Sequence, residues 1–102
     1  MNIWRKPIKA KPLKPSKFQI GDKVEILIDK EPYYSDYAGN PKVVIPKGSV
    51  GTIGAVNVPS VCREGVTFNC VDFVLEGVFS GNPIHKNNTW RCAVFTKDLK
   101  KV

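Results

Sequence analysis

Apolar residues of this 102-residue chain recur at every second position in short segments, and nowhere at the three- to four-residue spacing of an amphipathic helix. Glycine and proline, which favour turns, separate most of these segments. A period of two places successive side chains on opposite faces of an extended strand. The sequence therefore predicts an all-β protein.

In the segment FQIGDKVEILI (18–28), a turn is predicted at Gly21-Asp22, and the first strand follows it. Its alternation puts one apolar set on a single face: Val24, Ile26 and Ile28. Residues 29–42 are dense in Pro, Gly, Asn and Asp and predict a long loop. A short strand is expected at residues 43–45.

A turn at residues 46–48 precedes a long strand predicted over residues 51–58. Two glycines inside that strand predict a bulge or tight curvature, Gly51 and Gly54. A hairpin connection at residues 59–65 leads to VTFNCVDFVL, whose two largely apolar faces suit a central strand.

The segment TWRCAVF predicts a further strand, with three side chains pointing inward: Trp90, Cys92 and Val94. The chain is expected to close with a single 3₁₀ turn at residues 97–99 and a short terminal strand.

This order of segments resembles the SH3-like barrels of small bacterial and phage domains, including KOW-type domains of transcription and translation proteins. The resemblance lies in GDKV (21–24), IPKGSVGTI (45–53), VDF (71–73), and AV (93–94) followed by DL (98–99). It implies a five-stranded, partly open barrel over residues 18–102. The chain lacks the A-L-Y-D-Y motif of signalling SH3 domains, so the resemblance implies no proline-peptide groove.

Positive charge is concentrated in residues 1–17, MNIWRKPIKAKPLKPSK, which carry +6 and no acid. The remaining chain holds ten of the sixteen Lys and Arg residues against all nine acids. Pro7, Pro12 and Pro15 exclude a helix, so an extended arm is predicted.

Basic arms of this kind often attach to phosphate-bearing partners. The expected phosphate contacts are Arg5, Lys6, Lys9, Lys11, Lys14 and Lys17. Apolar residues are unusual in a solvated tail, and we expect them to dock on this domain or on a partner: Ile3, Trp4, Ile8 and Leu13.

The long loop contains all three tyrosines: Tyr33, Tyr34 and Tyr37. Exposed aromatic rings suit base stacking or peptide recognition. The alternative is that two of them cover the open end of the barrel. If the loops converge at one end, three basic residues are expected to line one rim with them: Lys47, Arg63 and Lys86. Acidic residues lie close to these in the sequence, so a solvated surface of balanced charge is the alternative.

Catalytic and metal-binding patterns are weak. His85 lies in a polar loop seven residues before Cys92, and a core cysteine beside a solvated histidine is favoured over a catalytic pair. The spacing C-x₇-C-x₁₄-H-x₆-C lacks the close cysteine pair of a zinc knuckle. No enzyme activity, metal or cofactor is predicted.

No apolar run approaches the roughly 18–20 residues that span a bilayer. No apolar h-region follows the basic first residues, so a secretory signal is not expected. Together with the odd number of three cysteines, this favours a reducing, cytoplasmic setting.

Two functions remain open. The first is a non-catalytic binding module of a nucleic-acid-associated assembly in transcription or translation, whose arm contacts phosphates while a barrel face docks protein or RNA. The second is a protein-interaction subunit or regulator, such as an accessory subunit or a phage protein that binds a host target, with the arm docked on the partner. Neither involves a membrane or a small-molecule substrate.

Overall fold

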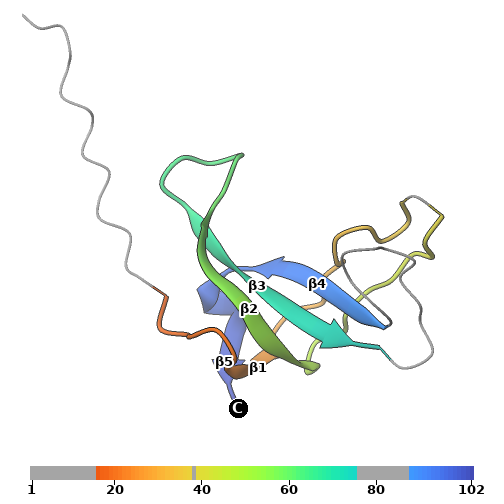
Figure 1. Cartoon of the computed structure of the whole chain (residues 1–102), viewed down its shortest axis with the longest axis horizontal. Helices are drawn as coiled ribbons and strands as arrows, with labels where there is room; N and C mark the ends of the chain where they lie inside the picture. Colours follow the sequence, from red (N-terminus) through yellow and green to blue (C-terminus); the bar gives the residue numbers. More distant parts are fainter. Residues whose placement is uncertain (1–15, 38, 76–87) are drawn as a thin grey trace, which may run out of the picture.

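The structure is a computed structural model that describes residues 16–37, 39–75 and 88–102 (Figure 1). The prediction of an all-β protein is confirmed, because these residues form strands, one 3₁₀ turn and no α-helix. The elements are β1 (Lys23–Ile26), β2 (Val50–Pro59), β3 (Thr67–Val74), β4 (Thr89–Val94), η1 (Thr96–Asp98) and β5 (Leu99–Lys101).

The five strands form one antiparallel sheet in the order β4-β3-β2-β1-β5. The sheet is not closed, because β4 and β5 are its outer strands and their described residues do not pair with each other. β5 joins β1 from the far end of the chain, where the N–H of Val102 donates to the carbonyl of Lys23 at 3.1 Å. Central placement of β3 agrees with its two apolar faces.

Strand β2 is long enough to pair first with β1 and then with β3. Its register with β3 shifts between Ile53 and Ala55 and again between Ala55 and Val58. The first shift falls at Gly54, which confirms a bulge there. Bulges bend the strand that carries them, and β2 is visibly curved (Figure 1).

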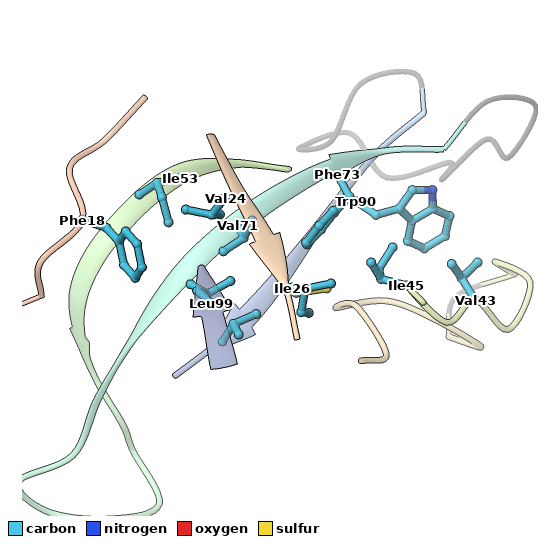
Figure 2. Packing of buried hydrophobic residues seen from close by; sticks show 12 residues of the cluster. Phe18, Val24, Ile26, Val43, Ile45, Ile53, Val71, Phe73, Trp90 and Leu99 are labelled. Atoms are coloured by element: carbon cyan, nitrogen blue, oxygen red, sulfur yellow. The ribbon is translucent and has the colours of Figure 1, made fainter. Parts of the chain in front are cut away.

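The core lies on one face of the sheet, between the strands and the loop that links β1 to β2. Figure 2 shows Phe18 near Ile53 at one end of it, and Trp90 near Ile45 and Val43 at the other. The predicted inward residues are confirmed, because each is at most 1% exposed: Val24, Ile26, Trp90, Cys92 and Val94. Ile28 was wrongly placed with them, since β1 ends at Ile26 and Ile28 is 37% exposed.

The loop between β1 and β2 contains no strand at residues 43–45. Only an isolated bridge forms there, in which Lys30 and Ile45 exchange both backbone hydrogen bonds at 3.0 and 2.7 Å. Pro41 and Pro46 bracket this segment, and a proline offers no backbone N–H to continue a ladder. The predicted short strand is therefore reduced to a single pair of residues.

The 3₁₀ turn lies at Thr96–Asp98, one residue earlier than predicted. The residue that the prediction assigned to the turn, Leu99, is 3% exposed and pairs with Ile26 as the first residue of β5. Burial in the core thus draws Leu99 into the sheet.

Asn69 is the polar side chain buried among the core-facing residues of β3, at 1% exposure. Its amide nitrogen donates to the carbonyl of Val94 at 3.2 Å and to the hydroxyl of Thr96 at 3.1 Å. These two bonds hold the residues on either side of Phe95, and so fix where that aromatic ring leaves the sheet.

Candidate partner-binding groove

The face of the sheet opposite the core carries the candidate site. Its side chains come from the residues of β3 and β4 that alternate with the core residues. Along this face Val58 pairs with Phe68, and Cys70 pairs with Ala93. A groove of about 490 Å³ lies over these pairs, between the β1–β2 loop and the turn that follows β2. This volume is in the range typical of ligand-binding sites.

Three parts of the chain line the groove. The floor is formed by Val58, Phe68 and Ala93 from three adjacent strands. Residues 59–62, which begin the turn between β2 and β3, form one wall. The remaining lining comes from Lys30, Tyr33 and Phe95. Most of the lining is aliphatic or aromatic, so the groove favours apolar ligands.

Tyr33 is held over the edge of β4 by its own backbone. Its N–H donates to the carbonyl of Arg91 at 2.9 Å, and the preceding Pro32 is buried. The ring is 45% exposed. Partial burial, with Cys70 and Cys92 nearby, raises the pKa of the Tyr33 phenol, which therefore stays neutral and able to donate a hydrogen bond.

The opposite wall is a tight turn built around Ser60. The Ser60 hydroxyl accepts the N–H groups of Cys62 and Arg63 at 3.2 and 3.3 Å, while its own N–H donates to the carbonyl of Val66 at 2.9 Å. With its backbone fixed in this way, Val61 projects a fully exposed side chain at the groove. Phe95 adds a ring that is 39% exposed.

The three tyrosines of the long loop do not lie at one site. Tyr33 lines the groove, whereas Tyr34 and Tyr37 lie against each other outside its lining, with ring centroids 6.1 Å apart and planes inclined at 50°. Tyr34 has a φ of 68°, in the left-handed region that only a well-held loop imposes on such a residue.

The expectation that Lys47 and Arg63 share one rim is wrong. Lys47 lies in the turn before β2 and Arg63 in the turn after it, so the ten-residue strand separates them. The first part of the β1–β2 loop lines the groove with Lys30 and Tyr33. The last turn of the same loop, which contains Lys47, lies at the start of β2. Only Arg63 of the two is near the groove.

Lys17 is the one predicted arm contact within the described residues, and its ammonium lies 5.3 Å from the centroid of the Phe18 ring. The other predicted contacts lie outside those residues: Trp4, Arg5, Lys6, Lys9, Lys11, Lys14 and Lys86.

His85 also lies outside the described residues, and with it the Cys–His and Cys₃His arrangements weighed above. Among the residues that are described, no three of His, Cys, Asp and Glu come together as a metal site. The same part of the chain holds no helix long and apolar enough to cross a membrane.

No protein-family model, curated protein or solved structure matches this chain. The groove is therefore interpreted from its own chemistry.

Next to the groove, the same face carries an ion pair. The guanidinium of Arg91 binds the carboxylate of Asp72 with two bonds, Nε to Oδ1 at 2.7 Å and Nη2 to Oδ2 at 3.0 Å. The hydrogen bond to Asp72 raises the pKa of Arg91, which keeps its charge. Both side chains are partly exposed. The apolar surface of the groove therefore ends at a charged pair on this side.

Of the lining residues, sequence analysis singled out Tyr33 and missed the others. Lys30, Val58, Phe68 and Phe95 are ordinary strand or loop residues when read locally. They become a site only because the sheet brings together segments that are far apart in the sequence.

The thiols of this region differ sharply in burial, and this difference predicts their reactivity. Burial raises the pKa of Cys92 to about 12 and also raises that of Cys70, whereas Cys62 is exposed beside the groove. At pH 8 the Cys92 thiol therefore stays protonated, and the thiolate is the reactive form. Iodoacetamide is therefore expected to modify Cys62 alone in the folded protein, and all three thiols in denaturant.

Peptide mapping by mass spectrometry measures this directly, and comparable labelling of Cys62 and Cys92 in the folded chain would contradict the burial described here. The same shift has a consequence for stability. Above about pH 9 the unfolded chain releases the Cys92 proton while the folded chain keeps it, so stability falls as the pH rises toward about 12.

Proposed function

We propose that this chain is a non-catalytic binding module of a larger assembly, which holds an extended apolar segment of a partner protein in the groove. The observation that carries this proposal is the lining itself, which joins an aliphatic and aromatic floor to two fixed walls. Exposed aromatic rings on a rigid frame are typical of interaction hot spots, and Tyr33 and Phe95 are such rings.

We further propose that the sheet is a partly open SH3-like barrel. Three features support this: the strand order with β5 beside β1, the long loop between β1 and β2, and the single 3₁₀ turn before β5. The groove lies between the two loops that flank β2, where a bound segment would contact both.

A selection experiment tests the groove. The full-length protein is used to select binders from a display library of random twelve-residue peptides, and the enriched peptides are labelled for fluorescence anisotropy. Two substitutions are then compared with the unmodified chain, Val61→Asp, which places a charge at the groove, and Phe95→Ala, which removes a ring. Each is expected to weaken binding about tenfold or more.

Ile20→Asp is the matched control for Val61→Asp, because Ile20 is 69% exposed and does not line the groove. It should leave the affinity unchanged within about twofold. Peptides that bind equally well to all of these variants, or a library that yields no binders, would overturn the proposal.

Nucleic-acid binding is the second candidate, because residues 1–17 carry +6 without an acid. In this alternative the arm contacts phosphates within transcription or translation machinery. Binding of labelled RNA or DNA would then fall steeply with salt and ignore Val61→Asp, since counterion release governs such affinity. Salt-resistant binding of peptides that is lost with Val61→Asp favours the groove instead.

A further inference from the structure

The chain enters the described structure along the open edge of β2. β1 pairs with β2 only at residues 50–52, so the rest of that edge is free for another segment. Gly21 and Asp22 exchange backbone hydrogen bonds with Ile53, both at 2.9 Å. Further along, the N–H of Ser16 donates to Oδ1 of Asn57 at 2.8 Å. Residues 16–22 therefore run antiparallel to β2.

The direction of residues 16–22 is the first argument for what occupies the groove. Three extended residues cover roughly 10 Å, and three residues also separate Asn57 from Ser60, just after the end of β2 at Pro59. A segment that kept this direction before Ser16 would reach residues 59–62, the wall of the groove that contains the exposed Val61. The residue three positions before Ser16 is Leu13.

The sequence at that point suits the groove chemically. Pro12 comes directly before Leu13, and Pro15 comes two residues after it. Proline favours extended backbone. Proline also carries no N–H, so little hydrogen bonding is lost when such a segment meets an apolar surface. A branched aliphatic side chain between prolines is a fitting occupant for a floor of Val58, Phe68 and Ala93.

We infer that the chain's own N-terminal arm occupies the groove, with Leu13 as its anchor, and that a partner segment must displace it. The tether makes this occupancy favourable. A short linker raises the effective concentration of the second contact to the millimolar range, so even a weak contact competes with a free partner. The inference rests on the proposed function in that both use the same groove.

Disulfide trapping tests the placement. The variant Leu13→Cys puts a thiol on the arm, and Cys62 lies in the groove wall, while Cys70 and Cys92 are buried. Incubation of dilute full-length protein with oxidised glutathione is expected to give a disulfide to Cys62 within one chain. The matched control is Asn2→Cys, on the same arm but distant from the proposed anchor. We expect Leu13→Cys to react at least about tenfold faster.

Non-reducing gels and peptide mapping distinguish the outcomes. A disulfide to Cys62 in monomeric protein, at a rate independent of protein concentration, supports the inference. Equal rates for the two variants would overturn it. Dimers whose rate rises with concentration would also overturn it, because they place the arm of a second copy in the groove.

A binding measurement separates this inference from the proposed function. The substitution Leu13→Asp should release the groove, so the selected peptides are expected to bind the full chain about three- to tenfold more tightly, while Asn2→Asp has no effect. Peptides that bind Leu13→Asp and unmodified protein equally leave the groove function standing and overturn the arm as its occupant. A fast Cys62 disulfide without any peptide binding supports the arm and overturns the partner proposal.

Discussion

Replacing Trp90 with alanine is expected to lower the free energy of unfolding by about 3–5 kcal/mol. Trp90 is 1% exposed and is the largest of the fully buried side chains in the described core. Figure 2 shows it beside Phe73 of the sheet and near Ile45 of the long loop. Its removal leaves a cavity at the contact between these two parts, and neither can close the gap without losing strand pairing.

Urea unfolding followed by circular dichroism measures the change. Val61→Ala is the control, because its side chain is fully exposed, and it should change stability by less than about 0.5 kcal/mol. If Trp90→Ala does not fold, Trp90→Phe keeps a ring in the site and is expected to cost about 1–2 kcal/mol. A loss below about 1 kcal/mol for the alanine variant would show that Trp90 does not join the loop to the sheet.

The second large effect is expected from Gly51→Ala, at about 2–3 kcal/mol. A Cβ atom at Gly51 would lie 2.7 Å from the carbonyl oxygen of Asp72 and 2.8 Å from Cγ1 of Val71. It would also lie 2.9 Å from the ring of Phe73. Backbone and buried side chains surround this point, so the added methyl group forces β2 away from β3.

Gly54→Ala is the matched control, with the same added methyl group three residues along the same strand. Its Cβ atom would meet only side-chain ends, Nη2 of Arg91 at 2.5 Å and Oδ2 of Asp72 at 2.6 Å. These groups are partly exposed and able to move, so the cost is expected to be about 1 kcal/mol or less. Thermal unfolding of the two variants measures both costs. Equal losses of stability would contradict the close packing described at Gly51.

These two glycines show where local sequence information ends. Both were predicted to mark curvature in one strand, and the register shift at Gly54 confirms this for one of them. Gly51 instead serves as a point of close approach between β2 and β3, and only the pairing of the strands shows which role each residue has. A glycine has no side chain whose pattern could distinguish them.

The alternation of apolar residues by itself determined that the chain is all-β, and it identified the inward sets of β1 and β4. It also located the 3₁₀ turn to within one residue. Side-chain direction in a strand is a local property with a period of two, so it can be read from neighbouring residues. That reading failed at Ile28 and at residues 43–45, where the end of pairing and the flanking prolines decided the outcome.

The groove, in contrast, was decided by tertiary structure alone. Its lining comes from Lys30, Tyr33, the turn after β2, Phe68 and Phe95, and no local pattern connects them. The separation of Lys47 from Arg63 was likewise invisible in the sequence, because it depends on the course of β2. Which strands pair, and where a loop crosses an edge, is set by the burial of a shared core, and that burial is a property of the whole chain.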